Sequence, residues 1–325
     1  MKSWWMVAGA QGPELELRDT PAPTPGPGQV LVQVQAAGLN RGEFITGQGL
    51  LGQLAQPKAM GMEAAGTVIA WGQGVSGFQV GQRIMGRAIG GFAEQALLVA
   101  TEAMPVPDHF EWVHAASLPI TYMVSHDMLV AQGELAPGEW LLLNGAASGV
   151  GTASLQLAQL IGAHTIGTSG QQHKLDALHQ IGLDASVLTR GGGFREEVMR
   201  RTGGKGVNLA INPVGGSILA EQVGCLAYRG RLAIVGYVDG QFSAPLDIGT
   251  VHAQRLRIFG VSNKNRTPAE RTASVADFTQ RFLPRMAERK LTPLIDRVFD
   301  FDQLPAAREH MQADRHIGKV VLQVG

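Results

Sequence analysis

The spacing of apolar residues changes along the chain, and the change comes near residue 112. Before that point, short apolar runs such as 3–8 and 29–38 are followed, through residues 61–100, by runs that glycine interrupts. In the run 29–38, Val30, Val32 and Val34 alternate with other residues, which is the period of a half-buried strand. Four prolines in the stretch 21–28 exclude a helix or central strand there, because proline lacks the N–H group. These residues predict a compact β-rich unit.

From residue 112 apolar residues recur at helical spacing, and Pro119 predicts an interruption of that helical segment. Predicted strands and helices then alternate, with the strands at 140–144, 163–169, 184–188, 207–212 and 231–236. Such alternation indicates an α/β fold, a doubly wound parallel sheet with helices on both faces.

The tail is predicted to carry a polar helix at 268–290, a strand at 295–301, a short helix at 304–312 and a strand at 318–324. Its last strand alternates like the strands of the β-rich front part, so we expect the tail to return to the first domain. The predicted domains are 1–117, 118–264 for the dinucleotide-binding unit, and 265–325 for the return to the first domain.

Composition and charge narrow the class of protein. The chain holds 27 Lys and Arg against 27 Asp and Glu, so no net charge draws it to nucleic acid or to an anionic membrane. Its one cysteine, Cys225, is predicted to be buried and inert, and it allows neither an internal disulfide nor a cysteine-rich zinc cage. We expect a cytoplasmic protein with no nucleic-acid partner and no membrane partner, because no apolar run approaches a membrane span of ~18 residues and the N-terminus is not that of a signal peptide.

The strongest local motif is a turn of small residues between the predicted strand 140–144 and the helix that follows. Its residues are Gly145, Ala146, Ala147, Ser148, Gly149, Val150 and Gly151. A helix N-terminus presents free N–H groups and a partial positive charge, and a pyrophosphate reaches them where side chains leave the backbone open. The motif is a variant of G-x-G-x-x-G with alanine at its second glycine. It predicts a dinucleotide site, and the alternative is a merely structural turn.

The next predicted strand bears on which dinucleotide binds. An NAD site usually has an acid about 20 residues past the glycine turn, where it binds the ribose hydroxyls. Here no acid occurs between Ser169 and Asp176. Ser169, Gly170, Lys174 and Arg190 suit a 2′-phosphate instead, so NADP(H) is the predicted cofactor. The alternative for Lys174 is an exposed lysine of a first helical turn.

Three segments together resemble the medium-chain dehydrogenase/reductase superfamily, in its zinc-free quinone oxidoreductase-like branch: AAGLNRGEF (36–44), GMEAAGTVIAWGQGVSGFQVGQRIMG (61–86) and NGAASGVGTASLQLAQLIGA (144–163). Weaker matches follow in order at 212–216, 230–237, 260–273 and 317–324. The resemblance implies a GroES-like β-rich catalytic domain built from both chain ends, an inserted Rossmann domain, and a nicotinamide in the cleft between them.

The sequence departs from the zinc enzymes of that superfamily. At the places of their Cys and His ligands it has Asn40 and Met62, neither a plausible zinc ligand, and the four-cysteine zinc loop is missing. We therefore expect no metal. The tyrosine that serves enoyl-thioester reductases as a proton donor is also absent from residues 44–54.

The resemblance further implies two catalytic candidates. Asn40 lies near the nicotinamide and holds the ribose or a substrate carbonyl, with Glu43 bracing its loop; the alternative is a turn residue with a satisfied side chain. Tyr122 is a possible proton donor, and the alternative is a packed helix tyrosine.

Further cofactor contacts are implied at strand ends. Gly236, Tyr237 and Val261 are predicted near the carboxamide of the nicotinamide. Arg315 and Lys319 are candidates for phosphate or substrate charge, with the protein surface as the alternative. A homodimer is expected from relatives that pair through an edge strand, which residues 238–249 are predicted to supply.

The function that follows is an NADPH-dependent, zinc-independent transfer of hydride to a small electrophile, a quinone or an α,β-unsaturated carbonyl. Orientation and water exclusion do most of this work when the acceptor is electron-poor. Two alternatives stay open: a 2-enoyl-thioester reductase, and a non-catalytic NADPH-binding protein.

Overall fold

The computed structural model describes residues 1–9, 12–45, 56–289 and 291–325. The chain forms two compact units, one of Met1–Met123 with Thr267–Gly325 and one of Val124–Arg266. Both ends of the chain therefore belong to the first unit. None of the helices in the described ranges combines the length and the apolarity that a bilayer crossing needs.

The first unit is built on strands from both chain ends. Its main sheet has the order β14-β15-β3-β5-β6-β7, and β3 also pairs with β7, which closes β3, β5, β6 and β7 on themselves. The strands are β3 (Gln29–Gly38), β5 (Glu63–Trp71), β6 (Arg83–Ile89), β7 (Gln95–Pro105), β14 (Ile295–Asp300) and β15 (Lys319–Gln323). A smaller sheet contains β1 (Lys2–Gly9), β2 (Gly12–Asp19) and β4 (Lys58–Ala59) in the order β2-β1-β4.

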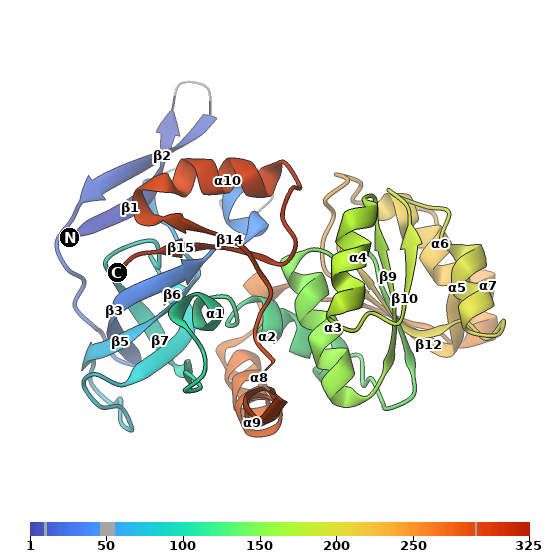
Figure 1. Cartoon of the computed structure of the whole chain (residues 1–325), viewed down its shortest axis with the longest axis horizontal. Helices are drawn as coiled ribbons and strands as arrows, with labels where there is room; N and C mark the ends of the chain where they lie inside the picture. The colour runs from blue at the N-terminus through green and yellow to red at the C-terminus, as the bar shows by residue number, and fades with distance from the viewer. Residues whose placement is uncertain (10–11, 46–55, 290) are drawn as a thin grey trace. The chain divides into compact units, whose positions relative to one another are not determined.

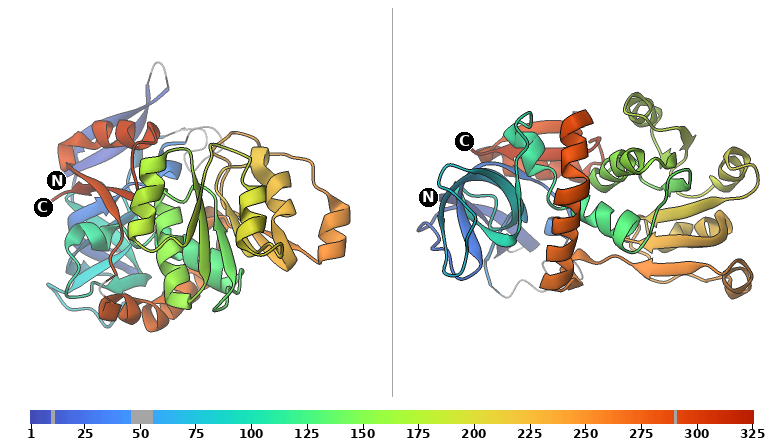
Figure 2. Two further views of the ribbon diagram at one scale, coloured as in Figure 1. Left: turned by 45° about the vertical axis from the view of Figure 1, so that its right-hand side comes forward. Right: turned by 90° about the horizontal axis from the view of Figure 1, so that it is seen from below.

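The predicted return of the tail is visible in the strand pairing. The last strand, β15, runs antiparallel to β3 with Val321 opposite Gly38, so the blue and red strands lie side by side in Figures 1 and 2. The alternation in β3 has the predicted consequence, because Val30, Val32 and Val34 are fully buried in the core of this unit. The expected β-rich GroES-like fold is confirmed.

Helices complete the first unit. They are η1 (Arg41–Phe44), α1 (Trp112–Ala116), α8 (Pro268–Arg281), α9 (Leu283–Arg289), η5 (Phe301–Gln303) and α10 (Leu304–Gln312). A break at 117–120 separates α1 from α2 (Thr121–His126), which continues into a π-helical turn at Asp127–Ala131. The interruption that Pro119 predicts is therefore present.

The second unit is a parallel sheet of six strands in the order β10-β9-β8-β11-β12-β13. The strands are β8 (Trp140–Leu143), β9 (His164–Ser169), β10 (Ala185–Leu188), β11 (Val207–Asn212), β12 (Leu226–Ile234) and β13 (Arg257–Gly260). The chain moves outward from β8 to β10 and then returns to the other side of β8. The order reverses between β8 and β11, as in a doubly wound nucleotide-binding fold.

Helices connect the strands of this unit and cover both faces of its sheet. They are α3 (Gly149–Ile161), α4 (Gln172–Gln180), α5 (Arg195–Arg201), η3 (Gly216–Ile218), α6 (Leu219–Gly224), α7 (Ile248–Gln254) and η4 (Asn263–Asn265). Helices α3 and α4 contact β8, β9 and β10, while α6 and α7 contact β12. Right-handed crossovers on opposite sides of the reversal put the two groups on opposite faces of the sheet. The Rossmann prediction is confirmed.

One predicted strand is wrong. Residues 238–249 are irregular until α7 begins at Ile248, and the edge strands of the sheet are β10 and β13. Pro245 lacks the N–H that a strand ladder uses, and Asp247 caps α7 by accepting a hydrogen bond from Thr250 N at 3.0 Å. Cys225 lies between the end of α6 at Gly224 and the start of β12 at Leu226.

Candidate functional site

The glycine turn lies between the end of β8 and the start of α3. Gly145 has a φ of +63°, a left-handed conformation that favours glycine. Ser148 is the N-cap of α3, and its Oγ accepts a hydrogen bond from Gly151 N at 3.0 Å. A methyl group on Gly151 would lie 2.4 Å from the Ala146 carbonyl oxygen, so this position accepts no side chain without a shift. The turn is therefore held close to the helix end.

The N-terminus of α3 attracts anions. The first N–H groups of a helix have no partner within it, and the aligned peptide dipoles add partial positive charge there. Ser148 takes the N–H of Gly151, and no acidic side chain lies in the first turn of α3. With 13 residues α3 is long enough to carry this dipole, and its first turn suits a diphosphate.

The turn after β11 lies next to the glycine turn. A Cβ on Gly145 would come 3.4 Å from Pro213 Cγ. Asn212 shapes this second turn, because its Oδ1 accepts hydrogen bonds from Val214 N at 2.9 Å and Gly215 N at 2.8 Å. Strands β8 and β11 are the two between which the sheet order reverses, and ligands of open α/β sheets bind at that point.

The residues predicted to select the dinucleotide lie around the end of β9. Arg190 follows β10, and its side chain lies over Gly170, where an added Cβ would be 3.1 Å from Arg190 Nε. Ser169 ends β9, and its Oγ accepts from Gln171 N at 3.3 Å. The nearest acid, Asp176, accepts from Gln172 within α4. The Ser169 hydroxyl and the exposed Arg190 guanidinium thus lie at the strand end where an NAD site has a carboxylate.

Lys174 is not the exposed lysine that the alternative interpretation expects. It lies in the first turn of α4 but is 7% exposed, so it is a buried lysine and not an exposed one. Ser169 is half-buried and Arg190 is exposed, so both are better placed than Lys174 to meet a ligand from solvent.

The other predicted cofactor contacts share the carboxyl edge of the sheet with the glycine turn. Gly236 follows β12 and donates from its N–H to the Asn212 carbonyl at 3.2 Å. Val261 follows β13, is buried, and donates to the Ile234 carbonyl at 2.8 Å. Tyr237 is exposed and lies with its ring centroid 4.5 Å from that of Phe242.

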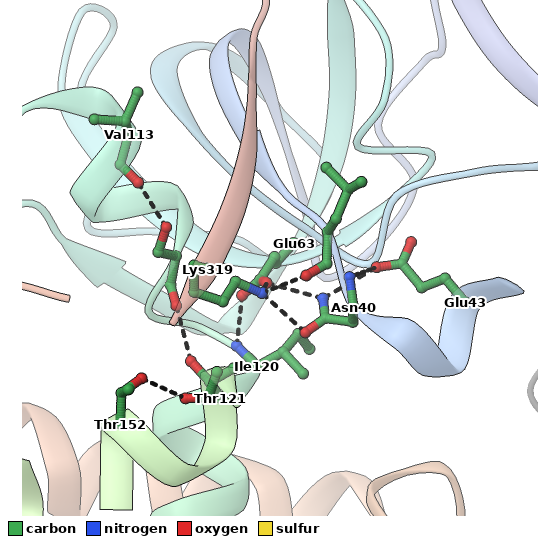
Figure 3. A network of polar contacts seen from close by, with 11 residues as sticks. Asn40, Glu43, Glu63, Val113, Ile120, Thr121, Thr152 and Lys319 are labelled. Carbon is green, nitrogen blue, oxygen red and sulfur yellow. Dashed lines mark hydrogen bonds and ion pairs between the residues drawn. The ribbon is translucent and has the colours of Figure 1, made fainter. Parts of the chain in front are cut away.

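In the first unit a buried polar cluster surrounds Asn40 (Figure 3). Lys319 on β15 forms an ion pair of 2.6 Å with Glu63 on β5, and both side chains are almost fully buried. Lys319 Nζ also donates to Asn40 Oδ1 at 3.0 Å and to the Leu39 carbonyl at 2.7 Å. Glu63 Oε2 accepts from Ile120 N at 2.7 Å, just before α2. The ion pair thus ties three separate segments of the first unit together.

Asn40 is held by this cluster through both of its amide donors. Its Nδ2 donates to Glu43 Oε1 at 3.0 Å and to Glu63 Oε1 at 2.8 Å, and its Oδ1 accepts from Lys319. The satisfied side chain of the alternative is what the structure shows. Both N–H groups of the amide are thus engaged within the first unit. The contact of Asn40 with the ribose or a substrate carbonyl stays a prediction.

Glu43 is the second carboxyl group of the cluster. It is buried at the end of η1, and its Oε2 has no hydrogen-bond partner among the described atoms. Burial and, to a smaller extent, nearby Glu63 raise the pKa of Glu43, while the hydrogen bonds from Asn40 and the charge of Lys319 lower it; the net result is a pKa of about 7. Glu43 thus holds a proton at mildly acidic pH.

The remaining predicted residues occupy ordinary positions. Tyr122 is buried with its ring 6.0 Å from that of Phe278, and burial raises the pKa of its hydroxyl, which supports the packed alternative over a proton donor. Arg315 is exposed in the loop after α10. Burial raises the pKa of the Cys225 thiol to about 12, consistent with an inert thiol.

Sequence reasoning missed several residues that organise these sites. Glu63 lies inside a recognised segment, yet a single carboxylate before Ala-Ala-Gly gives no sign of its partner 256 positions away. Lys319 is buried and not a surface charge. Asn144, Thr168 and Gln222 form hydrogen bonds below the glycine turn. In the sequence, the one signal for Asn144 is that a polar residue follows directly on the apolar run 140–143.

No group of three or more His, Cys, Asp or Glu side chains within the described ranges is arranged to hold a metal ion. Asn40 occupies one of the positions where the zinc enzymes have a ligand, and its side chain is engaged with Glu43, Glu63 and Lys319. Most of the segment 44–54, from which the tyrosine of the enoyl-thioester reductases is absent, lies outside the described residues.

Two protein-family models match the chain. Residues 26–108 match an alcohol dehydrogenase GroES-like domain, and residues 149–281 match a zinc-binding dehydrogenase domain. Among curated proteins, the chain is 31% identical over 305 residues to the highly reducing polyketide synthase lcsB of Purpureocillium lilacinum, and 32% identical over 304 residues to erythronolide synthase EryA2 of Saccharopolyspora erythraea. Each match covers 91% of this chain, and the chain spans 12% and 8% of those relatives.

Solved structures match over the full chain. The mycobacterial protein Rv1454c complexed with NADPH has a TM-score of 0.86 at 27% identity and 100% coverage of both chains. A mycobacterial quinone oxidoreductase has a TM-score of 0.84 at 25% identity and 100% coverage of both. The CurK enoyl reductase has a TM-score of 0.84 at 25% identity, with 100% of this chain and 99% of that chain covered.

A GroES-like unit made from both chain ends, with a Rossmann unit between them, defines an oxidoreductase fold. The chain belongs to the medium-chain dehydrogenase/reductase superfamily. Within it, the chain falls in the zinc-free quinone oxidoreductase-like branch, and the resemblance noted in the sequence is confirmed.

Proposed function

We propose that the chain binds NADPH at the carboxyl edge of its Rossmann sheet and reduces a small electrophile, a quinone or an α,β-unsaturated carbonyl. The observation that carries this proposal is the glycine turn. Gly145 adopts a left-handed φ, Gly151 leaves no room for a methyl group, and Ser148 caps α3. The Rv1454c structure, which has the same fold, is complexed with NADPH.

The residues around the end of β9 favour NADPH over NADH. The 2′-phosphate is an anion that Arg190 and the Ser169 hydroxyl suit by charge and by hydrogen bonding. Gly170 has no side chain, so the Arg190 side chain can lie across it. A carboxylate in this place would repel the phosphate, and the segment from Ser169 to Lys174 has none.

Bound NADPH supplies a hydride to the acceptor. The chain's part is to bind and orient the dinucleotide: the N-terminus of α3 for the diphosphate, Arg190 for the 2′-phosphate, and the backbone of Gly236 and Val261 for the carboxamide. An electron-poor acceptor needs little acid–base help, and a proton from solvent completes the reduction.

A 2-enoyl-thioester reductase is the second candidate, and the comparisons favour it specifically. One curated relative is a highly reducing polyketide synthase, another is an erythronolide synthase, and CurK is an enoyl reductase. The missing tyrosine in residues 44–54 opposes it, since that reaction uses a proton donor. A non-catalytic NADPH-binding protein is the third candidate, and the buried Tyr122 is compatible with it.

The test is an acceptor comparison with a binding control. NADPH binding is measured first by fluorescence, and NADPH oxidation is then followed with 1,4-benzoquinone and with crotonyl-CoA. Turnover of benzoquinone at the higher kcat/KM supports the first proposal, and turnover of crotonyl-CoA supports the second. Binding without turnover across a wider acceptor panel supports the third. Absence of NADPH binding overturns all three.

We also propose that the chain forms a homodimer through β13. This strand is an edge of the parallel sheet, and it leaves backbone N–H and C=O groups for a second copy to pair with. The segment before it exposes Val238, Phe242 and Ile248. Sedimentation analysis checks this: Ile258→Pro in β13 is expected to give monomers, and a dimer that survives it contradicts the proposal. The cytoplasmic location stays a prediction.

A further inference from the structure

A buried glutamine lies below the glycine turn, and the cofactor proposal does not use it. Gln222 is on α6 and is 0% exposed. Its Nε2 donates to Asn144 Oδ1 at 2.6 Å and to the Ile211 carbonyl at 3.1 Å. Both amide hydrogens are therefore directed at the ends of β8 and β11, the two strands between which the sheet order reverses.

Asn144 extends this chain of hydrogen bonds to a third strand. It is 1% exposed, and its Nδ2 donates to Thr168 Oγ1 near the end of β9 at 3.1 Å. The Thr168 carbonyl in turn accepts from Ala146 N, inside the glycine turn, at 3.1 Å. Side chains of Gln222, Asn144 and Thr168 thus join the carboxyl ends of β11, β8 and β9 directly beneath the turn.

The glutamine is a poor choice for packing alone. Its Oε1 is buried and has no hydrogen-bond partner among the described atoms. An unsatisfied buried acceptor destabilises a fold, and a methionine of similar length would fill the space without it. The gain that offsets this cost is the pair of hydrogen bonds that Nε2 donates.

We propose that Gln222 is a positioning residue for the dinucleotide, acting through Asn144 on the glycine turn; this inference rests on the proposed function. Asn144 immediately precedes Gly145, whose left-handed φ sets the direction of the turn. Holding the Asn144 side chain between Gln222 and Thr168 fixes where β8 ends and where the first N–H groups of α3 point. Without that restraint, the N–H groups no longer converge on one phosphate position, and part of the binding free energy is spent on ordering them.

The test is Gln222→Met with Gln159→Met as the matched control. Gln159 is also on the Rossmann unit, but its Nε2 donates to the Ile181 carbonyl at the far end of α3. We expect Gln222→Met to raise the Kd for NADPH roughly tenfold, as the loss of a buried hydrogen bond does. We expect its urea midpoint to fall only modestly, because the variant removes the unsatisfied Oε1 but also leaves Asn144 Oδ1 without its donor. In turnover the KM for NADPH should rise while kcat at saturation changes little. Gln159→Met should leave Kd unchanged.

A second variant covers the case in which Gln222→Met does not fold. Thr168→Val removes the acceptor at the other end of the chain of hydrogen bonds and is expected to weaken NADPH in the same way. In the double variant the two effects should not add, because both break one chain. Wild-type affinity in Gln222→Met or in Thr168→Val overturns the inference. Failure of the wild type to bind NADPH overturns the proposed function instead, so the two failures are told apart.

Discussion

Three buried glutamates of the first unit show how neighbouring residues decide the charge state of a side chain. Glu102 accepts from Arg87 at 2.6 Å and from Arg271 at 3.1 Å, so two cations meet one carboxylate. Glu43 and Glu63 instead share a single cation, Lys319, and the Asn40 amide. The second carboxyl group is left without a balancing charge, which is why burial raises the pKa of Glu43 to about 7.

The raised pKa predicts a pH-dependent stability. A folded-state pKa of about 7 against an ordinary value of 4.5 means that the folded state binds the proton more tightly. The contribution is fully present below pH 4.5 and is lost as the pH rises through 7; it amounts to roughly 3 kcal/mol of the free energy of unfolding. Urea unfolding of the wild type and of Glu43→Gln between pH 5 and pH 8 measures it.

The difference in the free energy of unfolding between the wild type and Glu43→Gln isolates the contribution of the Glu43 carboxyl group. Wild-type stability should fall with rising pH relative to Glu43→Gln, which has no proton to lose. The exposed Glu16→Gln variant is the control and should follow the wild type. Parallel curves for wild type and Glu43→Gln would show that Glu43 does not titrate in this range.

A second prediction for a single residue concerns Arg190 and the affinity for NADPH. Replacing it by glutamate puts a carboxylate over Gly170, where the 2′-phosphate is proposed to bind. We expect the NADPH Kd to rise roughly 10–100-fold, because a charge-assisted hydrogen bond is replaced by repulsion, with much less change for NADH. Lys205→Glu is the control, since Lys205 is exposed before β11 at the opposite edge of the sheet. Equal losses for both dinucleotides would contradict the assignment.

At the scale of elements, the glycine turn and α3 act as one piece. The turn takes its shape from Gly145, and the Ser148 cap joins it to the helix. Helix α3 is then held by an almost entirely buried set of side chains, so the positive end of its dipole has a fixed position. The same helix without this anchoring would offer its N–H groups in many orientations.

Two glycines of this element predict different outcomes. Gly149 is the first residue of α3 and is partly exposed, so Gly149→Val should fold with near-wild-type stability but lose NADPH binding by at least about tenfold, because its side chain blocks the approach of the diphosphate. Gly151→Ala should instead cost about 1–3 kcal/mol of stability, because its methyl group meets the Ala146 carbonyl.

Fluorescence titration and urea unfolding of both variants check this contrast. Unchanged NADPH affinity in Gly149→Val would count against the turn as the diphosphate site. Unchanged stability in Gly151→Ala would show that the turn relaxes easily.

At the scale of the whole molecule, the main feature is that the chain ends share one unit. Strand β15 completes the sheet beside β3, and Lys319 at its start supplies the charge that Glu63 needs. The front segment alone would bury Glu63 without a counter-charge. The first unit is therefore complete only after the Rossmann unit has been made and the tail has returned.

Removing that charge has a predicted cost. Lys319→Met leaves Glu63 buried and unpaired, which should lower the free energy of unfolding by about 3–5 kcal/mol. Adding Glu63→Gln should recover part of the loss, because the orphaned carboxylate is then neutral. Urea unfolding of the two variants and of the wild type measures this. A small effect of Lys319→Met would mean that water reaches Glu63 in the folded protein.

The sequence by itself determined the elements whose signals are local. The valine alternation of β3, the break at Pro119 and the strand–turn–helix around Gly145 depend on neighbours in the chain, so periodicity and turn chemistry predict them. The irregular segment 238–249 escaped the same reasoning, because Pro245 and the Asp247 cap outweigh its apolar residues. Tertiary structure alone decided which polar side chains meet. Lys319 reaches Glu63 across 256 positions and Gln222 reaches Asn144 across 78, and no local pattern encodes such pairs. Charge and hydrogen bonding are strong where water is excluded. Burial of these pairs therefore shifts the pKa of nearby groups and holds the side chains in fixed positions.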